Sequence, residues 1–195
     1  MTDTVGKKLK KKRGYVARAW GAVKYYSQTS YYLAYVYGWM RSMAQPYIST
    51  DFNVHQVVDN DNVFIGDIAS AYNRDKMKEI GITHVITAVL GVTPRFPEDF
   101  VYMTVPVRDV ASEDIQRYLT DTSEFINDAL TGGGKVLVHC ICGVSRSATI
   151  VAAWLMTRDG YTAEEAIQLL QSRRECVNPI PAFRKQLKNS EDYLI

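Results

Sequence analysis

Residues 139–147 combine two cysteines, a glycine and an arginine at a spacing that suits chemistry on phosphate. The stretch reads His-Cys-Ile-Cys-Gly-Val-Ser-Arg-Ser, and Arg146 lies six residues after Cys140. An apolar run precedes it and an apolar helical pattern follows, so it forms the turn between a strand and a helix. Backbone N–H groups converge in such a turn, and the helix dipole adds positive potential. The stretch therefore predicts a phosphate-binding loop.

The side chains of this loop have distinct predicted roles. The field that binds phosphate also lowers the pKa of Cys140 from a free value of about 8.5, which makes it a thiolate nucleophile able to form a cysteinyl-phosphate. Arg146 can grip two phosphate oxygens, which a lysine could not. Ser147 is placed to hydrogen-bond the departing sulfur, and His139 is expected to orient the loop. The loop residues expected to bind phosphate are Ile141, Cys142, Gly143, Val144, Ser145 and Arg146.

A leaving oxygen needs a proton from a group outside the loop, and Asp109 is the predicted donor. It follows a strand ending at Val107, so it lies on a loop at the same sheet edge as Cys140, and such loops can close over substrate. Glu113 and Asp114 are competitors for this role, and Asp109 could also be a capping or solvated acid.

The second cysteine of the loop and the histidines give weaker indications of function. Cys142 could form a disulfide with an oxidised Cys140, but the two-residue spacing is strained and favours a small loop-filling residue. No metal site and no cofactor are expected, because the three histidines, at positions 55, 84 and 139, lack ligand-like spacing.

Strand and helix patterns alternate from residue 62 onward. Strands are predicted over 63–66, 82–88, 101–107 and 135–139, and helices over 74–80, from a Ser112 cap to 131, over 147–158, from a Thr162/Glu165 capping box to 174, and through Phe183 to Leu194. This alternation predicts an α/β sandwich with a mostly parallel central sheet, whose ligands bind beyond the carboxyl ends of the strands.

The first 50 residues differ from the rest in composition. They hold nine Lys or Arg against one acid, whereas residues 51–195 hold 14 bases and 20 acids. They also carry eight of the thirteen tyrosines and two of the three tryptophans. We therefore expect an N-terminal basic, aromatic, helical extension over 1–50 and a catalytic domain over 51–195. The extension could also simply pack on that domain or be partly disordered.

The extension suggests partners and a location. A basic run at 7–13 followed by aromatic residues up to 42 could contact an anionic membrane surface or an import receptor, and it leaves self-association open. The odd count of three cysteines disfavours a disulfide framework and favours a reducing compartment. We expect a cytoplasmic or nuclear location, with a mitochondrial or membrane-associated one as the alternative.

Residues 139–149 resemble the His-Cys-x5-Arg-Ser/Thr loop of protein tyrosine phosphatases, and more specifically of the dual-specificity branch. The likeness extends to Asn62–Gly66, to Asp109 placed 31 residues before Cys140, and to Phe183 with Gln186-Leu187. The resemblance implies a five-stranded protein tyrosine phosphatase-like sheet flanked by helices. It implies Cys140 as nucleophile, Arg146 as phosphate ligand, Asp109 as general acid and then base, and Ser147 as the aid to thiolate departure.

The resemblance also implies a substrate class. Members of this branch accept phosphoserine and phosphothreonine as well as phosphotyrosine in proteins. Related lipid phosphatases often carry lysines inside the loop, whereas residues 141–145 are uncharged here, which favours a phosphoprotein over a phosphoinositide. A phosphate-recognising scaffold is the other alternative, and the nucleophilic Cys140 argues against it. An RNA triphosphatase would need a different loop polarity, and no nucleic-acid partner is expected.

Overall fold

The computed structural model describes residues 31–48, 52–59 and 61–195 and contains a five-stranded sheet. The strands are β1 (His55–Gln56), β2 (Val63–Gly66), β3 (His84–Thr87), β4 (Val101–Thr104) and β5 (Val136–His139), in the spatial order β1-β2-β5-β3-β4. β2, β5, β3 and β4 are parallel, and only β1 is antiparallel. The predicted mostly parallel sheet is confirmed. β5, which leads into the cysteine loop, is central and fully buried.

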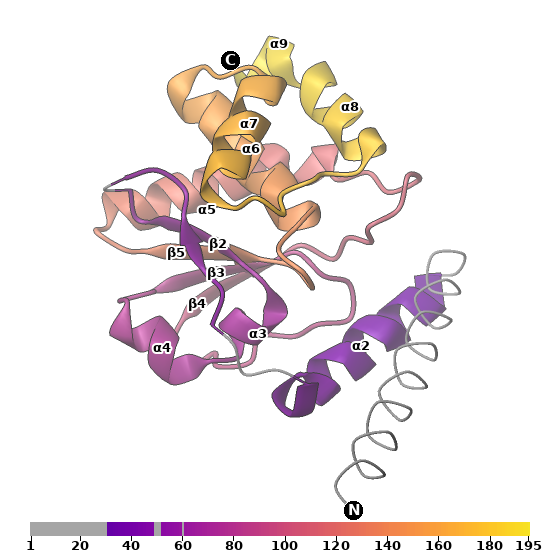
Figure 1. Ribbon diagram of the computed structural model, residues 1–195, viewed down its shortest axis with the longest axis vertical. Coiled ribbons are helices and arrows are strands. Elements are labelled where there is room, and N and C mark those ends of the chain that lie inside the picture. The colour runs from indigo at the N-terminus through magenta and orange to yellow at the C-terminus, as the bar shows by residue number, and fades with distance from the viewer. Residues whose placement is uncertain (1–30, 49–51, 60) are drawn as a thin grey trace, which may run out of the picture.

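Helices cover both faces of this sheet (Figure 1). One layer contains α5 (Leu119–Thr131), α6 (Arg146–Asp159), α7 (Ala163–Arg173), α8 (Pro181–Asn189) and α9 (Glu191–Leu194). The short helices α3 (Ile68–Ala71) and α4 (Arg74–Glu79) lie on the opposite side. α6 is buried from Arg146 to Met156 between the sheet and its neighbouring helices, and Trp154 within it is fully buried. This burial fixes the N-terminus of α6, where the cysteine loop ends.

Two helix predictions were wrong. Ser112 does not cap a helix: a 3-10 turn covers Gln116–Tyr118, and α5 begins only at Leu119. Glu113 forms an ion pair with Arg108 instead of sitting in a helical first turn. The closing segment consists of two helices, because the helical run is interrupted at Ser190 between α8 and α9. The Thr162/Glu165 capping box is present as predicted, and Gly160 ends α6 with φ of 72°.

The helix α2 (Tyr31–Ile48) belongs to the extension and lies against the catalytic domain, beside α3 (Figure 1). It turns small buried residues, among them Ala34 and Ser42, toward the domain. Residues 1–30 and 49–50 of the predicted helical extension lie outside the described residues. In the described part of the chain, no helix is both long enough and apolar enough to cross a membrane.

Candidate active site

The cysteine loop connects β5 to α6 and is shaped by one glycine. Gly143 has φ of 67°, a conformation that side chains other than glycine rarely adopt. A Cβ at this position would also lie 2.6 Å from the carbonyl oxygen of Gly66. The Gly143 amide donates a hydrogen bond to Cys140 Sγ over 3.3 Å. Gly143 therefore lets the loop close around the sulfur, as its position in the sequence predicted.

Cys140 is buried, and its surroundings favour the thiolate. Burial alone would raise the pKa of the Cys140 thiol, but the charge of Arg146 and hydrogen bonds from Ser147 and the backbone of Val144 lower it below its ordinary value. The hydroxyl of Ser147 lies 3.3 Å from Cys140 Sγ, where it can donate to a thiolate. The loop thus holds a thiol with a lowered pKa at the carboxyl end of the central strand, as a cysteine nucleophile requires.

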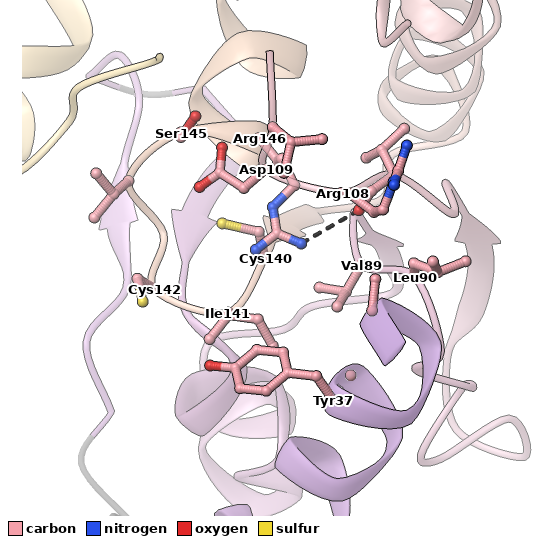
Figure 2. A pocket seen from close by; sticks show the side chains of 15 residues that line it. Tyr37, Val89, Leu90, Arg108, Asp109, Cys140, Ile141, Cys142, Ser145 and Arg146 are labelled. Carbon is pink, nitrogen blue, oxygen red and sulfur yellow. Dashed lines mark hydrogen bonds between the residues drawn. The ribbon is translucent and has the colours of Figure 1, made fainter. Parts of the chain in front are cut away.

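Arg146 and Asp109 extend into the same pocket as Cys140 (Figure 2). Arg146 Nη1 donates to the carbonyl oxygen of Val107 over 3.3 Å, which holds the guanidinium across the pocket. Among the described residues, the buried atoms Arg146 Nε and Asp109 Oδ1 have no hydrogen-bond partner. An unpaired buried polar atom costs about 1–3 kcal/mol, so these two atoms are set to meet a ligand that supplies the missing bonds.

The other predicted phosphate-binding residues surround this pocket. Ile141, Cys142, Val144 and Ser145 line it, whereas Gly143 contributes through its amide and its turn. Cys142 is exposed, Cys140 is buried, and neither forms a disulfide. Among the described residues, no group of three or more His, Cys, Asp or Glu side chains could hold a metal ion.

His139 is buried directly before the nucleophile. Burial lowers its pKa to about 4, so the imidazole is neutral at physiological pH. Its Nε2 lies 2.9 Å from the hydroxyl of Thr87 on the neighbouring strand, and its Nδ1 lies 3.3 Å from the carbonyl oxygen of Cys140. With Nδ1 protonated, the ring donates to this carbonyl and accepts from Thr87. This geometry fits the predicted orienting role.

Arg174 supports the loop from behind, and sequence reasoning missed it. Its side chain is buried, with Nε donating to the Gly143 carbonyl oxygen over 3.0 Å and Nη2 to that of Cys142 over 3.3 Å. Nη1 bonds the backbone and side-chain oxygens of Asn53. Because the carbonyls point outward to Arg174, the amides of the loop can point inward to a phosphate. In the sequence Arg174 only marks the end of the predicted helix, and nothing in its spacing indicates this contact.

The loop that carries Asp109 is held by contacts from far along the chain. Arg108 Nε donates to Glu113 over 2.6 Å, which engages one competitor for the acid role, while Asp114 is exposed outside the pocket lining. Gln186 on α8 accepts from the amides of Ile115 and Gln116 over 3.0 Å each and donates to the Glu113 carbonyl oxygen over 2.8 Å. Of the three acids, only Asp109 lines the pocket.

Comparison with known proteins identifies the class to which this fold and site belong. Residues 63–193 match the family model described as the catalytic domain of dual specificity phosphatases. Dual specificity protein phosphatase 1B of Arabidopsis thaliana is 43% identical over 129 residues, which cover 66% of this chain and 77% of that protein. Dual specificity protein phosphatase 1 of the same organism is 37% identical over 141 residues, covering 72% and 71%.

A solved structure supports the same assignment. The human tyrosine phosphatase-like serine/threonine/tyrosine-interacting protein superposes with a TM-score of 0.68 and 33% identity, over 74% of this chain and all of that one. The chain belongs to the dual specificity phosphatase family and is a hydrolase of phosphoproteins. The family match begins at Val63, so α2 lies outside it.

Proposed function

We propose that this protein phosphatase works through the residues that converge on the pocket, with Cys140 as nucleophile, Arg146 as phosphate ligand and Asp109 as proton donor. The observation that carries the assignment is the meeting of an activated thiol with two buried polar atoms, Arg146 Nε and Asp109 Oδ1, that lack protein partners among the described residues.

In the first step, the Cys140 thiolate forms a bond to phosphorus while the ester bond to the substrate oxygen breaks. Protonated Asp109 gives its proton to that oxygen, and Arg146 with the loop amides stabilises the charge on the transferring phosphoryl group. In the second step, Asp109 takes a proton from water, which attacks phosphorus and releases Cys140 as a thiolate. Ser147 stabilises that thiolate through its hydroxyl. The products are the dephosphorylated side chain and inorganic phosphate.

Turnover of a small aryl phosphate by the full chain tests this proposal. We expect activity in the wild type and in Cys176→Ser, and none above background in Cys140→Ser. Cys176 is exposed and outside the pocket lining, so its substitution leaves the buried thiol intact. Equal activity in Cys140→Ser would overturn the assignment of the nucleophile. Absence of turnover in the wild type would favour a phosphate-recognising scaffold.

The exposed face of α2 supports a second proposal, that the extension holds the catalytic domain at an anionic membrane surface. Large apolar side chains of this face are exposed, namely Tyr31, Tyr32, Leu33, Tyr35, Trp39, Met40 and Met43. Tyr and Trp are the residues that favour a membrane–water interface, and the basic run at 7–13 supplies attraction to anionic lipid. This proposal favours a membrane-associated location over the cytoplasmic, nuclear and mitochondrial ones.

Vesicle sedimentation tests it on the full chain. We expect binding to vesicles that contain phosphatidylserine, weaker binding to neutral phosphatidylcholine vesicles, and loss of binding in Trp39→Ser/Met43→Ser. Equal binding of wild type and variant would overturn the role of the face. A dimer that the variant dissociates would indicate self-association instead, and nuclear accumulation dependent on residues 7–13 would indicate an import receptor.

A further inference from the structure

One wall of the active-site pocket is formed by residues that precede the part of the chain matched by the phosphatase family model. Ala34, Tyr37 and Gly38 of α2 line the pocket together with the cysteine loop, the Asp109 segment and residues 89–90. Figure 2 shows the Tyr37 ring projecting from α2 toward Ile141, on the side of the pocket away from Asp109. The extension therefore takes part in building the site, and the family model, which begins at Val63, does not include it.

The contact between α2 and the catalytic domain is close enough to fix the helix in place. A Cβ on Gly38 would lie 1.9 Å from the carbonyl oxygen of Leu90, and one on Gly91 would lie 2.2 Å from that of Tyr35. Only glycines allow the two backbones to approach this closely. The helix and the 89–91 segment thus fit each other at one position, directly beside the pocket.

Contacts on either side of this glycine pair hold the rest of the helix. Near its start, the Arg108 guanidinium lies 5.7 Å from the centre of the Tyr31 ring. Further along, the Ser42 hydroxyl forms a hydrogen bond with the hydroxyl of Tyr72. Because Arg108 precedes the proposed acid Asp109, α2 contacts both the substrate pocket and the segment that carries the proton donor.

Tyr37 presents a flat, neutral aromatic surface to this pocket. Burial raises the pKa of the Tyr37 phenol; Arg41 and Arg146 lower it and Cys142 raises it, and the balance lies above the ordinary value. The phenol is therefore uncharged at physiological pH, as an unshifted tyrosine would also be, and it lies near the Arg146 and Cys142 side chains of the pocket. Val89, Leu90 and Ile141 add apolar side chains to the same pocket. Such a surface suits the phenyl ring of a phosphotyrosine, which stacks favourably on another aromatic ring.

We propose that Tyr37 is a specificity-determining residue that packs on the phenyl ring of phosphotyrosine and biases this dual-specificity site toward phosphotyrosine over phosphothreonine. The α2 wall deepens the pocket around Cys140. The phosphate of a phosphotyrosine can reach Cys140 at the bottom of this pocket, because a phenyl ring separates the phosphate from the peptide backbone. A phosphothreonine has no ring to stack, and its short side chain brings the backbone against the helix. The inference rests on the proposed function of Cys140.

Two peptides of one sequence, carrying either phosphotyrosine or phosphothreonine, test the proposal on the full chain. We expect Tyr37→Ala to lower kcat/KM for the phosphotyrosine peptide about three- to tenfold, the range that one aromatic contact gives, and to leave the phosphothreonine peptide unchanged. Tyr37→Phe should retain the wild-type ratio because it keeps the ring. Tyr32→Ala is the matched control, since Tyr32 lies on the same helix with 73% of its surface exposed.

The outcomes separate this inference from the proposed function. Equal losses on both peptides, or no loss on either, would overturn the role of Tyr37 while leaving that of Cys140 intact. If the wild type turns over neither peptide, binding to Cys140→Ser can be measured by calorimetry with and without Tyr37→Ala. Weaker binding of the phosphotyrosine peptide alone would support the inference, and an unchanged preference would overturn it. Thermal melts of all variants identify any general loss of fold.

Discussion

The cysteine loop and the Asp109 loop meet in one pocket but are built in opposite ways. The cysteine loop is short, buried between β5 and α6, and carries its nucleophile, arginine and turn glycine within seven residues. The Asp109 loop contributes one acid, and the segment that follows it is hydrogen-bonded to Gln186, more than 70 residues away. In the proposed mechanism the first loop binds and attacks phosphate, and the second delivers a proton. Because different contacts hold the two loops, we expect that the nucleophile and the acid can be weakened separately.

The largest separate effect is expected from Asp109→Asn. Losing the proton donor should lower turnover of phosphopeptides on the order of a hundredfold, because general acid catalysis contributes that much when the leaving group is poor. For an aryl phosphate whose leaving phenol is strongly acidic, the rate of cysteinyl-phosphate formation should fall far less. Single-turnover kinetics measures this first step separately. Asp114→Asn is the matched control, since Asp114 is exposed and outside the pocket. Similar losses in both variants would show that Asp109 has no special role.

A smaller effect is expected from Arg174→Met, which releases the carbonyls of Cys142 and Gly143. We expect kcat/KM to fall about tenfold and stability to fall by about 3 kcal/mol, because buried polar partners are left unpaired. The pKa of Cys140 should rise because the loop amides no longer point toward its sulfur. As the pH falls, the thiolate is then protonated at a higher pH than in the wild type. The acid limb of the pH–rate profile should move to higher pH, as should the pH dependence of alkylation by iodoacetate.

The neighbouring Arg173 offers a matched control for this prediction. Arg173→Met removes an ion pair with Asp59, a residue on the surface. Solvent-exposed ion pairs contribute little to stability, so activity and the Cys140 pKa should stay at their wild-type values. If Arg173→Met and Arg174→Met behaved alike, the proposed support of the loop by Arg174 would be wrong.

The smallest effect is expected from Gln186→Met, which leaves the amides of Ile115 and Gln116 unpaired. Loosening the Asp109 loop should lower kcat for phosphopeptides a few-fold, about the size expected from misplacing a catalytic group that remains present. The pKa of Cys140 should not change, because, among the described residues, the side-chain hydrogen bonds of Gln186 go to Glu113, Ile115 and Gln116 and not to the cysteine loop. Gln168→Met on the surface of α7 is the control. A shift in thiolate pKa would show that the two loops are not independent.

These contrasts also explain what the sequence could predict. The cysteine loop was predictable because a strand, a glycine turn and a helix start are local, and Cys140 and Arg146 lie on that one segment. Asp109 could be chosen because it follows a strand, but the helix assigned to Ser112 was wrong. The ion pair between Glu113 and Arg108 and the hydrogen bond from Gln186 to the Glu113 carbonyl oxygen outweigh the local capping signal at Ser112.

Long-range packing hid two further features. Arg174 reads as an ordinary basic residue at a helix end, although it binds the carbonyls of a loop 31 positions earlier. Tyr37 lies in an aromatic stretch with no motif, and its place in the pocket depends on the close approach of Gly38 to Leu90. Neither contact leaves a periodic or spacing signal in a single sequence.

Capture of the covalent intermediate tests the central claim most directly. Rapid acid quench of Ser147→Ala with a phosphotyrosine peptide, followed by mass spectrometry of the peptide that contains Cys140, should find phosphate on Cys140. This variant slows release of the thiolate, so the cysteinyl-phosphate should accumulate more than in the wild type. Cys140→Ser/Ser147→Ala should show none. Turnover without any phosphorylated Cys140, or with phosphate carried by another residue, would contradict the account.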